Sequence, residues 1–300
     1  MLKRLLILLI ITLAMFGGCL SNDKTASSSQ VPSSQSESPV NETYAPGEAN
    51  GSAPAVDREN DEPLSPTLKI VVPEGYTLAR IGMMLEENGI CSAAEFTESA
   101  QNNDFSAYPL IAQQVPSPNR CFSLEGYLFP DTYEIYRSET PLQIIRRMLE
   151  QTERQISDTL REQIAISGYT TDEIITIASI IEKEAFGDDV MPLISSVIHN
   201  RLNIGMRLQC DVTITYVMGA IQPFIYGDKA RFNDYYNTYT CPALPAGAIC
   251  NPGLTAIQAA LNPTQTDYYY FVTNEAKEYL FAESWEKHEQ NVIDSGIPTE

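Results

Sequence analysis

Positive charge is scarce in this sequence: 19 Lys and Arg residues stand against 39 Asp and Glu residues, a formal net charge of −20. Nucleic acids are bound by basic surfaces, so this balance argues against a nucleic-acid partner. It also disfavours electrostatic docking on anionic lipid. Histidine is scarce as well, and His199 and His288 are too far apart in the sequence to suggest a zinc site.

Common cofactor motifs are also missing. The sequence has no Walker-type GxxxxGK[ST], no GxGxxG dinucleotide fingerprint and no GxSxG nucleophile elbow. We therefore expect an activity that uses neither a cofactor nor a metal.

Large apolar residues are almost absent from residues 20–66, where Ser, Pro, Asn, Ala and acidic residues dominate. Such a segment cannot bury enough surface to offset the entropy lost on ordering. We predict a disordered tether, and a flexible chain of this length typically reaches roughly 35–40 Å.

The first 19 residues have the features of a secretory signal. Lys3 and Arg4 precede an apolar run from Leu5 to Phe16, and small residues lead to Cys19. Gly17-Gly18-Cys19 resembles the lipobox of bacterial lipoproteins, so Cys19 is the expected lipidation site. The alternative is an uncleaved membrane anchor, for which the run is short. Either interpretation places the rest of the chain outside the cytoplasm, tied to the membrane by its N-terminus.

Five cysteines remain after Cys19: Cys91, Cys121, Cys210, Cys241 and Cys250. An odd number leaves at least one without a partner in the same chain. Cys91 and Cys121 flank a predicted helix, and we expect a disulfide between them that stabilises the fold by about 3–4 kcal/mol in the chain-entropy description. Buried thiols are the alternative for every pair.

Residues 67–135 are predicted to form a small α+β unit. A strand, Leu68–Val72, is followed by a helix that begins near Thr77 and stops at Asn88-Gly89. Ser92 and Glu95 have the spacing of a capping box for a second helix. Another strand is predicted at Tyr127–Phe129.

A larger unit, residues 136–300, is predicted to be mostly helical with two short strands. The expected helices cover Pro141 to about Leu160, Thr171 to Ala185, Val190 to Leu202, Leu254–Leu261 and a last segment from Glu283; the strands are Tyr268–Val272 and Tyr279–Phe281. Helices and strands are segregated and do not alternate regularly, so we predict an α+β fold.

The helix EIITIASIIEKEA carries two carboxylates, Glu182 and Glu184. Two residues apart on a helix, they point to nearly opposite sides. Glu184 lies at the edge of the apolar stripe, after Ile177 and Ile180. Contact with isoleucines disfavours a charged carboxylate and raises its pKa, as a general acid near neutral pH requires. Glu184 is therefore the better candidate proton donor, although Glu-Lys-Glu at a helix end is more often a solvated surface.

Several long motifs carry a family resemblance. Four of them lie in the second half of the chain: ASIIEKEA, VIHNRLNIGMRLQCDVTITY, YYNTYTCPALPAGAICNPGLTAIQAALNP and YYYFV. Two lie upstream: EGYLFPDTYEIY and IVVPEGYTLARIGMMLEENGI. Together these motifs resemble those of the membrane-anchored endolytic murein transglycosylases, the YceG-like or MltG-like family. The similarity runs from about Leu68 to the C-terminus. The family commonly has a transmembrane helix and a LysM-like stretch before this part, where this chain has the lipobox and the tether.

The resemblance implies that Glu184 is the catalytic residue and that polar residues of the shared motifs bind substrate. These are Glu125, Asn200, Arg201, Gln209, Asp211, Asn237 and Tyr239. Each also has a structural interpretation, such as a helix end at Asn200-Arg201 or a helix cap at Asp211. Cys210 and Cys250 both lie inside these motifs, which makes them a second candidate disulfide and leaves Cys241 without a partner.

The implied activity is cleavage of peptidoglycan glycan strands at the bond between MurNAc and GlcNAc, with one glutamate as acid and base. Peptidoglycan and the membrane are the implied partners, with cell-wall synthases as further candidates. Two alternatives stay open. One is a muramidase that uses a second carboxylate, Glu125 or Asp131, as water-using glycosidases do. The other is a wall-binding scaffold lipoprotein without catalysis.

Overall fold

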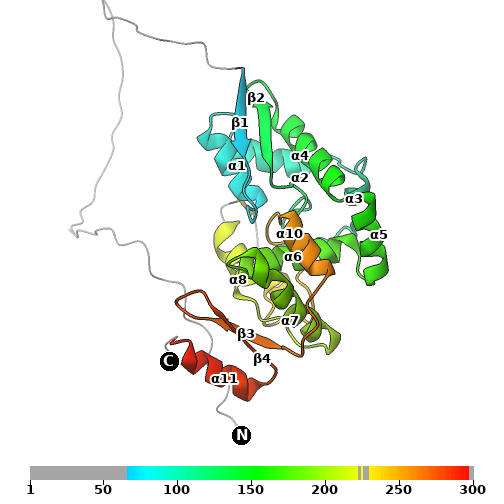
Figure 1. Cartoon of the computed structure of the whole chain (residues 1–300). Helices are drawn as coiled ribbons and strands as arrows, with labels where there is room; N and C mark the ends of the chain where they lie inside the picture. Colours follow the sequence, from blue (N-terminus) through cyan, green and yellow to red (C-terminus); the bar gives the residue numbers. More distant parts are fainter. Residues whose placement is uncertain (1–65, 222–223, 226–229, 297–300) are drawn as a thin grey trace, which may run out of the picture. The chain divides into compact units, whose positions relative to one another are not determined.

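The first strand of the protein pairs with a strand about 60 residues later in the sequence. In the computed structural model, which describes residues 66–221, 224–225 and 230–296, β1 (Thr67–Val71) runs antiparallel to β2 (Thr132–Tyr136) (Figure 1). The signal segment, Cys19 and the tether up to residue 65 lie outside the described residues. The predicted strand near Leu68 is confirmed.

The predicted strand Tyr127–Phe129 is wrong, because its backbone bonds elsewhere. The N–H groups of Gly126 and Leu128 both donate to the Asn251 side-chain oxygen, at 3.0 and 2.8 Å. Gly126 has a left-handed φ of 91°, which interrupts an extended strand. The partner of β1 lies a few residues later, where Tyr133 and Ile135 alternate inward along β2.

Four helices complete this end of the molecule: α1 (Leu78–Glu87), α2 (Ala93–Asn102), α3 (Pro109–Ala112) and α4 (Pro141–Gln155). The starts of α1 and α2 agree with the sequence predictions. The Thr77 side chain accepts a bond at the start of α1, and Ser92 and Glu95 form the capping box of α2. Helix α2 packs against α4, so the small lobe consists of the β1–β2 pair and helices α1 to α4.

The single helix expected from Pro141 to Leu160 is two helices. At the end of α4, Ile156 leaves helical geometry with a ψ of 74°, and the Ser157 side chain caps α5 (Asp158–Ser167). Ile156 is fully buried, so the break between the two helices places this apolar side chain in the core. The next two predicted helices are confirmed, as α6 (Thr171–Glu184) and α7 (Met191–Asn203), with a 3₁₀ turn at Asp188–Val190 between them.

The remaining chain alternates short helices with irregular segments. It forms α8 (Asp211–Thr215), a π-helical turn (Tyr216–Ala220), α9 (Ala230–Tyr236), α10 (Leu254–Leu261), the strands β3 (Tyr270–Thr273) and β4 (Tyr279–Ala282), and α11 (Trp285–Asp294). The strands pair as an antiparallel hairpin with Tyr270 opposite Ala282. The predictions for α10, the two strands and the last helix are confirmed.

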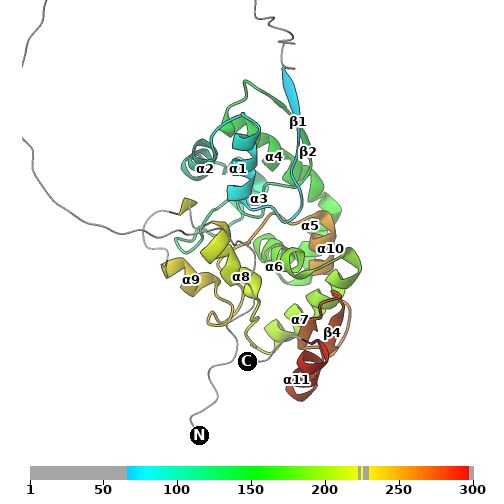
Figure 2. The same ribbon diagram turned by 90° about the vertical axis from the view of Figure 1, so that its left-hand side faces the viewer.

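Helix α6 is the centre of the core. Every residue from Ile174 to Ile181 is buried, and α10, α7, α5 and α8 pack around the helix. The β1–β2 pair with α1, α2 and α4 lies at one end, and β3–β4 with α11 lies at the other (Figures 1 and 2). The described residues thus belong to one unit within residues 64–299, and the predicted α+β class is confirmed.

No disulfide bond joins the cysteines of the described residues, so both expected pairs, Cys91–Cys121 and Cys210–Cys250, are wrong. The buried thiols act as weak donors to backbone carbonyls. Cys250 Sγ donates to Ser179 O at 3.4 Å, and Cys210 Sγ donates to Leu208 O at 3.6 Å. The alternative of buried thiols describes this part of the protein.

Within the described ranges, no single helix is long and apolar enough to cross a membrane. Helices α5 and α6 pass that test only as a pair, and they are bent by 95° relative to each other.

Candidate functional site

Glu184 is the last residue of α6, at the end opposite the helix cap. The helix begins with a capping box between Thr170 and Glu173, and its axis runs through the core. After Glu184 the chain turns away, with Ala185 in an extended conformation and Gly187 at a φ of 142°. The buried helix thus fixes the position of a carboxyl group where the core meets the surface.

The environment of Glu184 favours its protonated form. The residue is half-buried, and loss of hydration raises the pKa of its carboxyl to about 7, with a further upward contribution from the negative charge of Asp211. A hydrogen bond with the Cys210 thiol and the positive charge of Arg201 act in the opposite direction. A carboxyl with a pKa of about 7 is partly protonated at neutral pH and can donate that proton.

Arg201 holds the loop that approaches Glu184. It is buried on α7, and its Nε donates to Tyr269 O at 2.6 Å while its Nη1 donates to Leu208 O at 2.5 Å. The guanidinium also lies 5.2 Å from the centre of the Tyr270 ring. Since these donors point at protein, the side chain orients the loop and supplies positive charge near Glu184.

Asp211 and Tyr239 form a pair beside Glu184. Asp211 is the exposed first residue of α8, and its Oδ1 accepts a hydrogen bond of 2.6 Å from the Tyr239 hydroxyl. The predicted cap role of Asp211 is wrong, because Cys210 occupies the N-cap position and no side-chain cap bond is present. Burial, followed by this bond, raises the pKa of Tyr239, and the charge of Glu184 adds to the effect.

The other predicted residues support this region. Gln209 is exposed with a left-handed φ of 52°, and its N–H donates to Thr238 O at 3.1 Å. Asn200 donates its amide to Thr266 O and Tyr268 O at 2.8 and 2.9 Å, and Asn237 accepts from the Tyr239 N–H at 3.0 Å. The two asparagines therefore fix the backbone that surrounds the site.

Glu182 lies on the other side of α6, as its position two residues before Glu184 predicts. Its carboxylate accepts a bond of 3.1 Å from the Gly253 N–H. Burial raises its pKa, and the Gly253 bond acts against that rise. Glu182 is therefore engaged with the loop before α10, away from the Asp211–Tyr239 pair.

Glu125 is not part of the Glu184 site. It is 1% exposed, and its carboxylate accepts from Leu78 N at 2.8 Å, Tyr216 Oη at 2.9 Å and Asn251 Nδ2 at 3.2 Å. Burial raises its pKa to about 8 although all three bonds act to lower it. With both oxygens occupied by protein donors, Glu125 joins the small lobe to the π-helical turn and offers no face to a ligand.

Asp131, the other candidate second carboxylate, lies just before β2. It accepts a hydrogen bond from Gln151 on α4 and one from the backbone N–H of Thr132. It therefore belongs to the small lobe.

Tyr279 contacts Glu184 but was not predicted. Its hydroxyl donates to the Glu184 backbone carbonyl at 2.6 Å, and the Glu184 charge contributes to a raised pKa, behind burial as the main cause. The residue lies 95 positions later in the sequence, on β4, so only the fold brings the two together. Tyr236, which precedes Asn237 in the same motif, is fully buried in the core.

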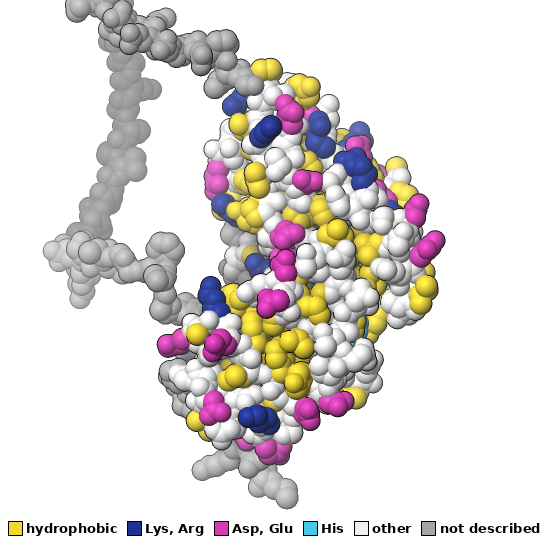
Figure 3. Space-filling view, in the orientation of Figure 1, with side chains coloured by type: hydrophobic (Ala, Val, Ile, Leu, Met, Phe, Trp, Pro, Cys, Tyr) yellow, Lys and Arg dark blue, Asp and Glu magenta, His cyan; other side chains and the backbone are white. Residues whose placement is uncertain are grey.

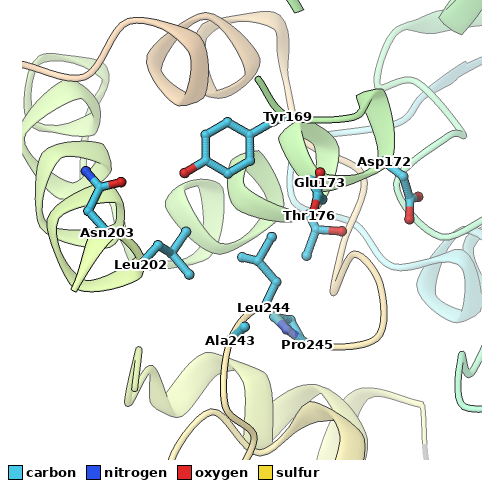
Figure 4. Close-up of a pocket in the computed structure, with 9 residues that line it drawn as sticks. All are labelled: Tyr169, Asp172, Glu173, Thr176, Leu202, Asn203, Ala243, Leu244 and Pro245. Atoms are coloured by element: carbon cyan, nitrogen blue, oxygen red, sulfur yellow. The ribbon is translucent and has the colours of Figure 1, made fainter. Parts of the chain in front are cut away.

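Two hollows in the described part of the protein are not lined by Glu184. One of about 450 Å³ surrounds the N-terminal end of α6 and is lined by Tyr169, Asp172, Glu173, Thr176, Leu202, Asn203, Ala243, Leu244 and Pro245 (Figure 4). Glu173 and Glu184 are about 16 Å apart along the helix at 1.5 Å per residue. Asp172 is already paired with Arg120, and Glu173 belongs to the capping box, so we do not place the chemistry there.

Among the described residues, no group of His, Cys, Asp and Glu could hold a metal ion.

The sequence and structure were compared with known proteins. The model of the YceG-like family matches residues 52–294. An endolytic murein transglycosylase of Streptococcus pneumoniae (strain D39) is 32% identical over 78% of this chain and 46% of its own length. That of Bacillus subtilis (strain 168) is 30% identical over 73% of this chain and 63% of its own length.

A crystal structure of a YceG-like protein from Listeria monocytogenes superposes with a TM-score of 0.64. It is 31% identical, over 74% of this chain and 75% of that one. The chain spans about half to two thirds of the length of the curated relatives it matches. The family match covers most of the chain and includes Glu184 and every residue of its surroundings. The chain therefore belongs to the YceG-like family.

Proposed function

We propose that this protein is an endolytic lytic transglycosylase that cleaves the β-1,4 bond between MurNAc and GlcNAc in peptidoglycan. The observation that carries this proposal is Glu184, a half-buried carboxyl at the end of a rigid core helix with a pKa raised to about 7. The names of the relatives support the substrate class. The site acts outside the cytoplasm, where its substrate lies.

One carboxyl is sufficient for this reaction because no water is consumed. Glu184 donates its proton to the glycosidic oxygen, and the bond from that oxygen to the MurNAc anomeric carbon breaks. The C6 hydroxyl of the same MurNAc then bonds to the anomeric carbon, and Glu184 takes up the hydroxyl proton. The products are a GlcNAc end and a 1,6-anhydroMurNAc end, and the glutamate is again protonated.

Asp211 and Tyr239 support the acid by their charge and hydrogen bond. The Asp211 carboxylate disfavours a second negative charge at Glu184, and the Tyr239 hydroxyl holds that carboxylate in place at 2.6 Å. Arg201 limits the rise in pKa. These opposing charges keep the pKa of Glu184 near neutral pH, where the same carboxyl group can both donate and accept a proton.

The two alternatives make different demands on the protein. A muramidase needs a second carboxylate beside the first. Glu125 and Asp131, the candidates from the sequence, are bonded to protein groups away from Glu184, and Asp211 is the carboxylate whose charge acts on it. A scaffold protein would bind glycan without needing Glu184 at all.

Cleavage of purified, end-labelled glycan strands tests the proposal. We expect the wild-type protein to produce fragments of intermediate length early, as an enzyme that cuts within strands must. Glu184→Gln should bind the same strands and leave them uncut. Binding by both proteins with cutting by neither would instead establish the scaffold function.

The membrane tie is a separate proposal that concerns residues outside the described part. We expect Cys19 to be lipidated, anchoring the protein to the outer face of the cell membrane through the tether, within reach of the wall and of cell-wall synthases. Cys19→Ser should accumulate as a precursor that incorporates no labelled fatty acid. Equal labelling of this variant and the wild type would exclude lipidation at Cys19.

A further inference from the structure

Phe186 is a large apolar side chain on the surface beside the candidate acid. It lies two residues after Glu184 and is 61% exposed. Single exposed apolar residues are common, so exposure alone identifies nothing. Its surroundings distinguish it from the other exposed apolar side chains of the described residues.

The backbone of Phe186 is held in place by the same hydroxyl that contacts Glu184. The Phe186 N–H donates to Tyr279 Oη at 2.9 Å, and that hydroxyl donates to the Glu184 carbonyl at 2.6 Å. One tyrosine on β4 thus fixes the chain on both sides of Ala185. The position of the Phe186 backbone relative to the acid is therefore set by the fold.

A series of aromatic rings continues from Phe186 onto the hairpin. Its ring centre lies 6.3 Å from that of Tyr279, which stacks on Phe281 at 6.0 Å, and Phe281 stacks on Tyr268 at 5.4 Å. The rings of the hairpin are only half-buried. Hydrophobic side chains gather on the face where β3, β4 and the neighbouring part of α7 lie, with acidic side chains around them (Figure 3).

A cation covers part of this surface. Lys277, in the turn between β3 and β4, has a left-handed φ of 63° and places its Nζ 5.0 Å from the Phe186 ring centre. An ammonium over an aromatic face is attracted by the ring. Lys277 is not in an ion pair with any described residue, so it has no carboxylate holding it away from Phe186.

We propose that Phe186, framed by Tyr279 and Lys277, is a glycan subsite that stacks on one N-acetylated sugar ring beside the bond that is cleaved. The inference rests on the proposed function, because it takes the substrate to be a glycan strand positioned at Glu184. The apolar C–H face of a pyranose packs on an aromatic ring, and such a contact needs an exposed ring at a fixed distance from the chemistry. Phe186 has both properties.

The test is a pair of variants in the full chain. Phe186→Ala should raise the KM for purified glycan strands about tenfold, which corresponds to about 1.4 kcal/mol, and should leave kcat within about twofold. Phe186→Tyr should keep the wild-type KM, since it keeps the ring. Ile166→Ala is the control, because Ile166 is 85% exposed on α5, near the opposite end of α6, and should change neither constant.

Binding without cleavage separates this inference from the proposed function. In the Glu184→Gln background, the added Phe186→Ala change should weaken binding to uncut strands about tenfold, whereas Ile166→Ala should not. An unchanged affinity would overturn the subsite even if the wild-type protein cuts strands normally. If the wild type binds strands through Phe186 and cuts none, the subsite stands and the transglycosylase proposal fails.

Discussion

Two glutamates of this protein have similarly raised pKa values and different surroundings. Glu184 at the end of α6 has a pKa of about 7 and Glu125 at the lobe junction has one of about 8, and burial is the main cause in both. Glu125 receives three hydrogen bonds from protein donors and is 1% exposed. Glu184 is half-buried and lies at the surface end of its helix. A raised pKa therefore does not identify a catalytic acid unless the carboxyl also has room for a substrate.

The largest effect expected at Glu184 is on catalysis. Glu184→Gln should lower the rate of strand cleavage at least about 100-fold, because general acid catalysis contributes about 10²–10⁴-fold. Glu182→Gln, a matched change two residues away, should retain a rate within about tenfold of the wild type. Cleavage rates at pH 6 measure this, and the reverse ranking would show that the acid lies on the other side of α6.

For stability the order should be reversed: loss of Glu125 should destabilise the fold more than loss of Glu184. Glu125→Ala leaves Leu78 N, Tyr216 Oη and Asn251 Nδ2 without their acceptor in a closed environment, and we expect a loss of about 4 kcal/mol in the free energy of unfolding. Glu184→Ala should cost less than about 1 kcal/mol, since it removes no comparable network. Urea unfolding of both variants at pH 6 measures the difference, and equal losses would break the comparison.

Both raised pKa values predict how stability depends on pH. Between the ordinary glutamate pKa of 4.5 and the folded values of about 7 and 8, the folded protein holds protons that the unfolded chain has released. Their contribution is therefore present below about pH 4.5 and is lost as the pH rises through 7 to 8, on the order of 3 kcal/mol for Glu184 and about 5 kcal/mol for Glu125.

Urea unfolding at pH 5, 6.5 and 8 checks this dependence. In Glu184→Gln the fall in stability between pH 5 and 8 should be smaller than in the wild type, because one of the two groups no longer titrates. The raised pKa of Glu184 would be contradicted if the free energy of unfolding rose between pH 5 and 8, and rose more in the wild type than in Glu184→Gln.

A smaller effect should come from the carboxylate beside the acid. Asp211→Asn removes a negative charge that raises the pKa of Glu184, so the loss of kcat/KM at alkaline pH should begin at a lower pH than the wild-type value of about 7. Tyr239→Phe is the control for the shared hydrogen bond, since it keeps the Asp211 charge. An unchanged pH profile in Asp211→Asn would remove Asp211 from the site.

Much of the fold could be predicted where the sequence has local signals. The predicted start near Thr77 and the Ser92–Glu95 capping box agree with the structure, and the apolar periodicity of α6 places Glu184 at the edge of the core. The failures have tertiary causes. Tyr127–Phe129 reads as a strand, but its backbone bonds to the distant Asn251 side chain. The break at Ile156 follows from its burial in the core.

Local signals and the resemblance also account for some, but not all, of the residues around Glu184. The resemblance supplies Arg201 and Asp211, whose charges act on the pKa of Glu184, and Tyr239, whose own pKa is raised in part by the Glu184 charge. Glu125 comes from an equally polar motif and is buried elsewhere, since a motif does not show which way a side chain points. Tyr279 has no local signal, because its contact with Glu184 depends on the position of the β3–β4 hairpin.

The most direct test of Glu184 as a single acid and base is the chemistry of the new chain ends. Purified glycan strands digested in ¹⁸O-labelled water would be analysed by mass spectrometry. We expect 1,6-anhydroMurNAc ends, about one water lighter than hydrolysed ends and free of ¹⁸O, with none formed by Glu184→Gln. Reducing MurNAc ends that carry ¹⁸O would mean that water attacks the anomeric carbon, and a second carboxylate would then be required.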